Sequence, residues 1–140
     1  LRVLNVHLQS VGLASDDYDA VRDGTDSEDR KRLISRLSRA YSLRAKQARE
    51  LNENISISPY DVLLAGDFND TPVSYAVNAI ENMHDAFTVA GLGLGATYIG
   101  DLQGLRIDYL MYTDGLSAVD FTTCNIKLSD HRPITAKFNF

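Results

Sequence analysis

A long amphipathic segment in the first half of the chain restricts the possible folds more than any other feature of the sequence. Between residues 27 and 52, apolar side chains recur at helical spacing and form a single stripe. The stripe consists of Leu33, Ile34, Leu37, Ala40, Tyr41, Ala45, Ala48 and Leu51. Because a helix with one apolar face must bury that face, we expect a helix from about Ser27 to Asn52 that covers a sheet. Thr25 and Glu28 stand at capping-box spacing at its start.

The same segment carries most of the basic charge of the chain. More than half of the 14 Lys and Arg residues fall within it, namely Arg30, Lys31, Arg32, Arg36, Arg39, Arg44, Lys46 and Arg49. Such a run is typical of a solvated helix face, and a patch that attracts phosphate is the alternative. The formal net charge of −5 argues against a protein that grips long duplex nucleic acid, because that task needs many cations near the phosphates.

Segments with strand character flank the predicted helix. Residues 1–9 alternate in polarity, which predicts a strand with one apolar face and a second face that carries Val3, Asn5 and His7. Four further strands are predicted after it, over residues 61–65, 105–112, 117–126 and 134–140. The sequence Thr113-Asp114-Gly115 predicts a hairpin turn between the second and third of these four strands.

The remaining segments are predicted to form loops and a second helix. Residues 15–24 are polar and acidic and favour a loop with one helical turn, and residues 91–104 are rich in glycine and favour an irregular loop. Pro72 suits the first turn of a helix that continues to about Met83. Strands mixed with two helices in 140 residues indicate one layered α/β domain over residues 1–140.

Polar residues gather in four clusters at the ends of predicted strands, where α/β proteins tend to carry their functional side chains. The first cluster contains Asn5 and His7, which share a strand face. A single histidine in a strand is more often a hydrogen-bonded structural residue than a catalytic one, so this cluster is a weak signal by itself.

The second cluster is Gly66-Asp67-Phe68-Asn69. Glycine lets the backbone turn sharply after an apolar strand. Asp67 and Asn69 are two positions apart, so both face one way while Phe68 turns into the core. A carboxylate beside a carboxamide suits a hard cation or an attacking water molecule. A simple turn is the alternative, because Gly, Asp and Asn are common turn residues.

The third and fourth clusters combine carboxylates with a histidine. Asp108 interrupts the otherwise apolar strand at residues 105–112, and a partly buried carboxylate there needs a partner. That partner is either an arginine, in a structural salt bridge, or an imidazole that Asp108 orients. Asp130 and His131 are adjacent, which brings together a metal-binding oxygen and a titratable base.

Together, the four clusters resemble the second half of the endonuclease/exonuclease/phosphatase superfamily. The shared motifs are N-x-H, G-D-F-N, R-I-D-Y and S-D-H-x-P, which begin here at Asn5, Gly66, Arg106 and Ser129 in the same order. The superfamily includes pancreatic-type deoxyribonucleases, apurinic endonucleases, bacterial sphingomyelinases and inositol polyphosphate 5-phosphatases. The resemblance implies an α/β fold, half of a four-layer α/β sandwich with a mixed, mostly antiparallel sheet flanked by helices. Residues 1–140 would then be the C-terminal portion of such a domain.

The resemblance also implies catalytic roles. His131 matches the general base that takes a proton from the attacking water, and Asp108 matches the aspartate that orients its imidazole. Asp67 and Asn69 match the pair that positions the nucleophile and steadies the phosphoryl oxygens. His7 matches a second histidine, present in the deoxyribonuclease and sphingomyelinase branches but not in the apurinic endonucleases, which contacts the phosphate or assists the leaving group.

Metal and substrate ligands follow from the same resemblance. Asp130 matches a ligand of a divalent cation, usually Mg²⁺ with Mn²⁺ as an alternative, and Asp67 and Asn69 are further candidate ligands. Asn5, Asn69 and His7 are candidate substrate-binding residues.

The function implied by the resemblance is a metal-dependent phosphoester hydrolase, a phosphodiesterase, nuclease or phosphatase. Its substrate would be a small or lipid-derived phosphoester, or nucleic acid. The alternative is a catalytically silent or incomplete fragment that acts as a structural or interaction module. The family carries its main glutamate metal ligand in the first half of the domain, which these residues do not match. We therefore expect residues 1–140 alone to be inactive, to bind Mg²⁺ weakly and to self-associate through an uncovered sheet face.

Overall fold

The computed structural model of the chain describes residues 1–12, 27–100 and 102–140. Its elements in chain order are β1 (Arg2–His7), α2 (Ser27–Ser56), β2 (Val62–Asp67), α3 (Tyr75–Asn78), β3 (His84–Asp85), α4 (Ala86–Ala90), β4 (Asp108–Tyr112), β5 (Ser117–Thr123) and β6 (Ile134–Asn139). The predicted loop over residues 15–24 and the capping residue Thr25 lie outside the described residues. Within the described ranges, no helix combines the length and the apolar character needed to cross a membrane.

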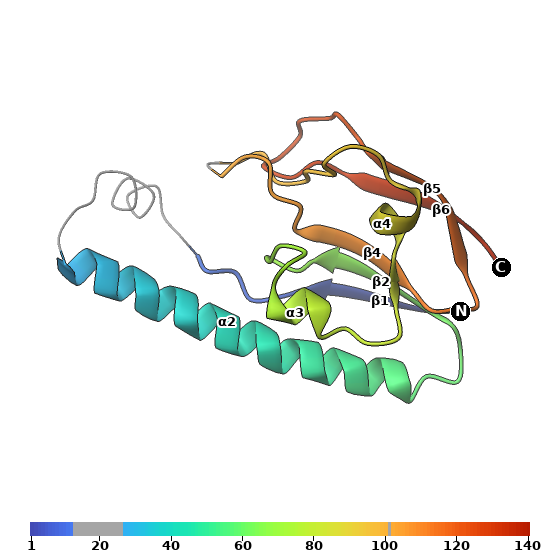
Figure 1. Cartoon of the computed structure of the whole chain (residues 1–140), viewed down its shortest axis with the longest axis horizontal. Coiled ribbons are helices and arrows are strands. Elements are labelled where there is room, and N and C mark those ends of the chain that lie inside the picture. Colours follow the sequence, from blue (N-terminus) through green and yellow to red (C-terminus); the bar gives the residue numbers. More distant parts are fainter. Residues whose placement is uncertain (13–26, 101) are drawn as a thin grey trace.

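A four-stranded mixed sheet with the order β1-β2-β4-β3 forms the centre of the fold (Figure 1). β1 and β2 are parallel, whereas β4 is antiparallel to both β2 and β3. His7 pairs with Asp67, and Asp67 pairs with Asp108, so three strand ends bring these side chains to one end of the sheet. The mixed sheet with flanking helices confirms the predicted α/β class.

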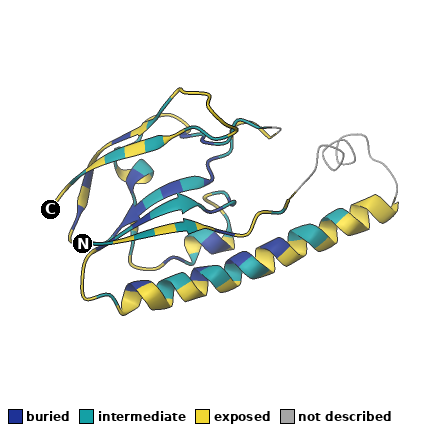
Figure 2. Cartoon of the chain, turned by 180° about the vertical axis from the view of Figure 1, so that it is seen from behind, coloured by how far each residue is buried: buried dark blue, intermediate teal, exposed yellow. Residues whose placement is uncertain are grey.

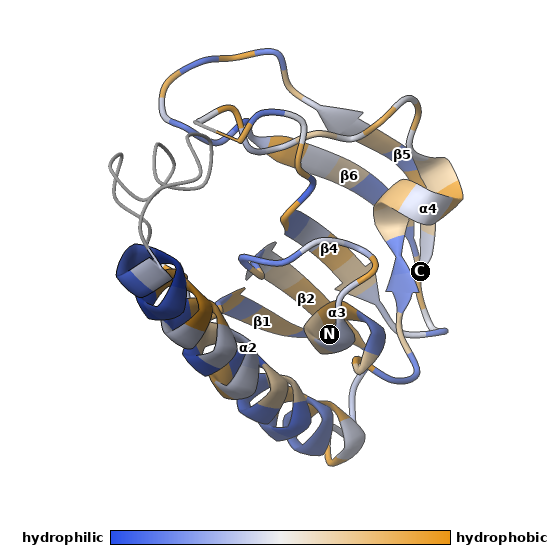
Figure 3. Cartoon of the chain, turned by 60° about the vertical axis from the view of Figure 1, so that its left-hand side comes forward, coloured by the Kyte–Doolittle hydropathy of each residue, from blue (hydrophilic) through white to orange (hydrophobic). Residues whose placement is uncertain are grey.

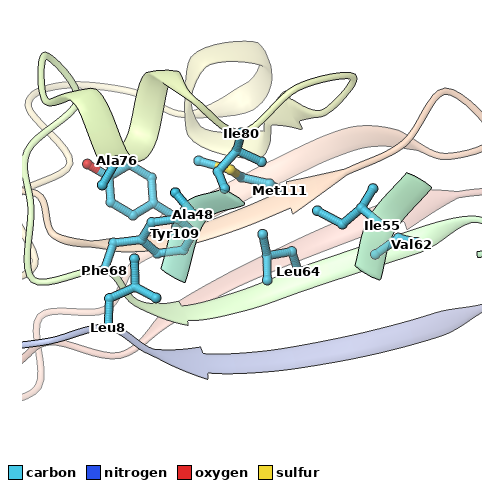
Figure 4. Packing of buried hydrophobic residues seen from close by; sticks show 10 residues of the cluster. All are labelled: Leu8, Ala48, Ile55, Val62, Leu64, Phe68, Ala76, Ile80, Tyr109 and Met111. Carbon is cyan, nitrogen blue, oxygen red and sulfur yellow. The ribbon is translucent and has the colours of Figure 1, made fainter. Parts of the chain in front are cut away.

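Helices α2 and α3 cover one face of this sheet (Figure 3). The C-terminal half of α2 contributes Ala48, Leu51 and Ile55 to a core that also contains Leu64 and Tyr109 (Figure 4). Burial of an aliphatic or aromatic side chain of this size contributes about 1.5 to 3 kcal/mol. The helix continues beyond its predicted end to Ser56, because Ile55 is still part of the core.

The N-terminal half of α2 extends past the strands and is largely exposed (Figure 2). Ile34 and Tyr41, predicted on the buried stripe, are exposed there, so the stripe covers the sheet only in the C-terminal half of the helix. Arg44, expected on the solvated face, is only 1% exposed, and its Nε donates to Asp70 Oδ2 at 2.9 Å. Its Nη1 also donates to the carbonyl of Gln9, which ties α2 to the segment after β1.

The two strands β5 and β6 form a separate antiparallel sheet that packs, with α4, on the other face of the central sheet. The predicted hairpin at Thr113-Asp114-Gly115 is therefore wrong. A tight turn is present, since the Leu116 N–H donates to the Thr113 carbonyl at 3.0 Å, but it joins β4 to a strand of the other sheet. Turn residues specify the reversal of the chain, and they do not specify which layer the next strand joins.

The predicted helix from Pro72 to Met83 is reduced to the single turn of α3. Asn52 on α2 explains the early end, because its side-chain amide donates to the Ala79 carbonyl and its Oδ1 accepts the Glu81 N–H at 3.1 Å. Those contacts replace the backbone bonds of a longer helix. The short helix α4, which was not predicted, follows a capping carboxylate, Asp85.

β1 is an edge strand, and one of its faces is open. Leu4 and Val6 pack against the core, whereas Val3, Asn5 and His7 are exposed, as the alternating pattern predicted. Val3 is 60% exposed although it is apolar. The expected self-association through this face stays a prediction.

Candidate active site

Gly66 allows β1 and β2 to approach each other at the end that carries the polar side chains. Its φ angle is +148°, and a Cβ built at this position would lie 1.9 Å from the carbonyl oxygen of Val6. A side chain there is incompatible with the backbone of β1. This close approach sets the separation between His7 and Asp67, whose Nε2 and Oδ2 atoms are 3.5 Å apart.

Asp67 and Asn69 form a compact hydrogen-bonded unit. The backbone N–H of Asn69 donates to Asp67 Oδ1 at 2.7 Å, and Asn69 Nδ2 donates to Asp67 Oδ2 at 3.0 Å and to the Leu8 carbonyl at 3.1 Å. Asn69 has a φ angle of 50°, which asparagine tolerates better than most residues. Phe68 between them is buried and packs edge-on against Tyr109, with the ring centroids 4.9 Å apart. The predicted orientation of this cluster is confirmed.

Asp108 contacts His131 and not an arginine. The Nδ1 atom of His131 lies 2.9 Å from Asp108 Oδ2, and the carboxylate is an acceptor, so Nδ1 carries the proton. The Nε2 atom is then free to accept a proton, and it lies 3.9 Å from Asp67 Oδ2. Arg106 forms an ion pair with Asp85 instead, at 2.7 Å but without the alignment of a hydrogen bond. Among the described residues, no arginine forms the structural salt bridge considered for Asp108.

Thr97 and Tyr98 support this pair, and the sequence offered no signal for them beyond their place in a glycine-rich loop. The buried Thr97 hydroxyl accepts the backbone N–H groups of Ile107 and Asp108 at 3.1 and 3.2 Å. These bonds explain why β4 begins at Asp108, later than the predicted strand start. The Tyr98 ring meets the His131 ring edge-on, with the centroids 5.3 Å apart. Both contacts restrict the position of the His131–Asp108 pair.

The clusters line one open pocket of about 700 Å³. The sequence-predicted residues that line it are His7, Asp67, Asn69, Asp108, Asp130 and His131. Asn5 is not among the lining residues and lies exposed further along β1, so its role in substrate binding stays a prediction. Asp130 is exposed, and its role as a metal ligand likewise stays a prediction.

The pocket concentrates negative charge. Burial raises the pKa of the Asp67 carboxyl, and the charge of Asp108 adds to this effect, which outweighs the opposing contributions of the Asn69 N–H and the neighbouring histidines. Burial alone would lower the pKa of His131. The hydrogen bond to Asp108 and the charges of Asp108, Asp67 and Asp130 outweigh it, so the pKa of His131 lies above its ordinary value of 6.5. Both shifts indicate a site that favours a proton or a cation.

The donor chemistry of the pocket fits a hard divalent cation. Asp67, Asp108 and His131 each offer a ligand atom within 4.8 Å of the others. This group shares only Asp67 with the ligand set predicted from the sequence. Asp108 and His131 are already bonded to each other, so we regard Asp67 as the member most available to an ion. The Asn69 carboxamide and the exposed Asp130 carboxylate add further oxygen donors of the kind that Mg²⁺ prefers.

The sequence of this site matches a known family. The model of the endonuclease/exonuclease/phosphatase family matches residues 8–131, a range that contains all of the pocket residues named above except His7. The chain belongs to the endonuclease/exonuclease/phosphatase family. A search of curated proteins found no significant match.

Solved structures with a similar fold match this chain at low sequence identity. A conserved protein of unknown function from Enterococcus faecalis V583 has a TM-score of 0.66 and 16% identity, and the match covers 98% of this chain and 49% of that one. A family member from Bacteroides vulgatus has a TM-score of 0.61 and 23% identity, with coverage of 71% and 44%. Mannosyl-6-phosphatase from Bacteroides thetaiotaomicron VPI-5482 has a TM-score of 0.57 and 17% identity, with coverage of 73% and 46%.

These similarities establish the fold of the family. The match spans less than half of the length of each of these structures, so the chain corresponds to part of the domain that they contain.

Proposed function

We propose that this chain forms the part of a phosphoester hydrolase that carries the general base, His131. The observation that carries the proposal is the 2.9 Å contact between His131 Nδ1 and Asp108 Oδ2. That contact holds the proton on Nδ1 and leaves Nε2 as a proton acceptor at the pocket wall. No serine or cysteine lies in a comparable arrangement with His131 among the described residues, which supports direct attack by water.

The hydrolysis proceeds by proton transfer to His131. Its Nε2 accepts a proton from a water molecule as the water oxygen forms a bond to phosphorus. The bond between phosphorus and the alcohol oxygen breaks, and that oxygen takes a proton from His7 or from solvent. Asp108 stabilises the imidazolium of His131, since its carboxylate lies beside the charged ring.

Asp67 and Asn69 serve as positioning residues in this scheme. Asn69 binds both carboxylate oxygens of Asp67 and thereby fixes the carboxylate between His7 and His131. Mg²⁺, or Mn²⁺ in its place, held by Asp67, Asn69 and Asp130, would neutralise charge on the phosphoryl oxygens. The oxygen donors and the raised pKa of Asp67 support this assignment.

The substrate that we propose is a small or lipid-derived phosphoester, with nucleic acid as the next candidate. A volume of about 700 Å³ suits a small organic phosphate, and the net charge of −5 disfavours a long polyanion. Rates measured with 4-nitrophenyl phosphate, bis(4-nitrophenyl) phosphate and a single-stranded oligonucleotide would rank the three classes.

The test of the mechanism is His131→Ala in a form of the protein with measurable hydrolysis, either these 140 residues or a longer polypeptide that contains them. We expect turnover to fall by at least about 100-fold, which is the usual scale for the loss of a general base. His84 provides a matched control, because its Nε2 lies 2.6 Å from Asp114 in an exposed His–Asp pair outside the pocket. His84→Ala should leave turnover unchanged. Near-normal turnover of a folded His131→Ala variant would contradict the proposal.

A further inference from the structure

A second groove, separate from the catalytic pocket, begins at the residue after His131. Its volume is about 540 Å³, and no residue that lines it also lines the catalytic pocket. We call this concavity the Arg132 groove. The residues that line it and could contact a ligand include Leu92, Leu94, Phe121, Thr123 and Arg132. None of the motif residues assigned to phosphoester hydrolysis belongs to it.

Arg132 brings a positive charge to this groove without a counter-charge. Its Nε atom is buried and has no hydrogen-bond partner, and its guanidinium forms no ion pair within the part of the chain that the structure describes. A buried N–H without an acceptor is costly, and a guanidinium offers five such donors in a planar fork. An anion in the groove would supply both the missing acceptor and the missing negative charge.

Thr123 adds a second donor to the same groove. Its hydroxyl oxygen is buried and also lacks a hydrogen-bond partner. Thr123 pairs with Ile134 in the β5–β6 register, and Arg132 precedes Ile134 by two residues. Both side chains line the groove, and Thr123 Oγ1 and Arg132 Nε are its buried atoms without a hydrogen-bond partner. Two unsatisfied polar groups therefore converge on one volume.

Most of the other residues that line the groove are apolar, with Thr122 as the exception. Leu92 and Leu94 are 92% and 87% exposed, which is unusual for leucines that line a concavity. Phe121 is buried and belongs to the core between the two sheets, so it closes the inner end of the apolar wall. A ligand with a short apolar chain would remove the two leucines from water, at a gain proportional to the area covered.

The backbone around the groove is held by hydrogen bonds that do not depend on a ligand. The Arg132 N–H donates to the Thr97 carbonyl at 2.7 Å, and the Cys124 N–H donates to the Pro133 carbonyl at 2.8 Å. The first bond fixes the loop that carries the leucines, and the second fixes the end of β5. The groove is therefore preformed, as small-molecule sites usually are.

We propose that the Arg132 groove binds a small organic anion, a carboxylate or phosphate headgroup that carries a short apolar chain. The headgroup accepts hydrogen bonds from Arg132 and Thr123, and the chain packs on Leu92 and Leu94. This binding requires no hydrolysis and does not depend on the function proposed above.

The test is direct binding to the full 140-residue chain, measured by calorimetry with octyl phosphate, octanoate, inorganic phosphate and 1-octanol. We expect one or both amphiphilic anions to bind and to shift the Nε–H resonance of Arg132 in NMR spectra. The tighter of the two identifies the headgroup. Inorganic phosphate and 1-octanol should bind about 10-fold more weakly or not at all, since each lacks half of the contacts. Inorganic phosphate binding as tightly as octyl phosphate would overturn the apolar part of the proposal.

Variants separate binding from folding. Arg132→Gln should weaken anion binding by about 10- to 100-fold, the scale of a lost charge-assisted contact. Arg39→Gln is the matched control, an exposed arginine outside the groove that should bind as the wild type does. Thr123→Val keeps the shape of the side chain and removes the unsatisfied hydroxyl, so it should raise the Tm while it weakens binding. Failure of both amphiphilic anions to bind, or unchanged binding by Arg132→Gln and Thr123→Val, would overturn the proposal.

Discussion

The imidazole of His131 is held by the carboxylate of Asp108 at 2.9 Å, although the two residues lie 23 positions apart in the chain. Asp108 begins β4, and His131 lies in the segment that leads into β6. Thr97 links the two segments, because its hydroxyl accepts the Asp108 N–H and its carbonyl accepts the Arg132 N–H. The orientation of the histidine thus depends on three separate stretches of chain.

Asp108→Asn should lower the pKa of His131 and reduce turnover. The hydrogen bond and charge of Asp108 are what outweigh the effect of burial on this imidazole, so their loss favours the neutral ring. NMR titration of the metal-free chain should give a His131 pKa above 6.5 in the wild type and a lower one in the variant. An unchanged His131 titration would refute the coupling between the two residues.

The raised pKa of His131 also makes a prediction for stability. A histidine whose folded-state pKa exceeds its unfolded value stabilises the fold fully below the unfolded pKa and loses that contribution as pH rises through the folded pKa. The free energy of unfolding of wild-type chain minus that of His131→Gln should therefore fall as pH rises above 6.5. Denaturant unfolding of both proteins at a series of pH values measures this difference in the free energy of unfolding. A difference that grows as pH rises would contradict the prediction.

Asp67→Asn should strongly reduce hydrolysis and yet raise stability at neutral pH. The fold disfavours the charged form of Asp67, chiefly through burial, and an asparagine Oδ1 can still accept the Asn69 N–H. Turnover should fall by about 100-fold or more, as for other losses of charge stabilisation. A turnover assay tests the first part. Thermal unfolding with and without Mg²⁺ tests the second part and the role of Asp67 as a metal ligand, since only the wild type should gain stability from the ion. A Tm of the variant below that of the wild type in metal-free buffer would contradict the claim that the buried charge of Asp67 destabilises the fold.

Gly66→Ala should destabilise the fold by about 2 to 4 kcal/mol, because the new methyl group meets the backbone of β1 and the φ angle is unfavourable. Gly104→Ala is the control, with a φ angle of +94° and no atom within 4 Å of the added Cβ. It should cost about 1 to 2 kcal/mol from backbone strain alone. If urea unfolding shows that both variants lose the same free energy of unfolding, the contact with Val6 does not contribute to the cost of Gly66→Ala.

Arg44→Met should cost about 3 to 5 kcal/mol, because it leaves the buried Asp70 carboxylate without its ion partner. The double variant Arg44→Met/Asp70→Leu should recover part of that loss. The remainder reflects the lost hydrogen bonds from Arg44 to the Gln9 carbonyl and from the Thr71 N–H to Asp70. Arg49→Met on the exposed side of α2 should change stability by less than about 0.5 kcal/mol. A coupling free energy of zero between Arg44 and Asp70 in a double-mutant cycle would show that their ion pair does not stabilise the fold.

Local patterns in the sequence were sufficient for the long helix, for the longer strands and for the titratable residues of the pocket. Alternation placed Leu4 and Val6 inside and His7 outside, and the two-residue spacing of Asp67 and Asn69 predicted their common orientation. These features depend on neighbouring residues, whose relative directions follow from the backbone period of a strand or turn. The motifs that gave the family resemblance are of the same local kind.

Contacts between distant residues were decided only by the tertiary structure. Whether the strand after Thr113 paired with β4 or joined another sheet depended on the packing of its Phe121 against Phe87 of α4, which no local pattern records. Arg44 looked like its exposed neighbours because its partner Asp70 is 26 positions away. The pairing of Asp108 with His131 was predicted only through the family resemblance, because the local pattern left an arginine open as the partner of Asp108. The sequence by itself determined which residues could do the chemistry, whereas long-range packing determined which of them meet, because the free energy of those contacts exists only in the folded chain.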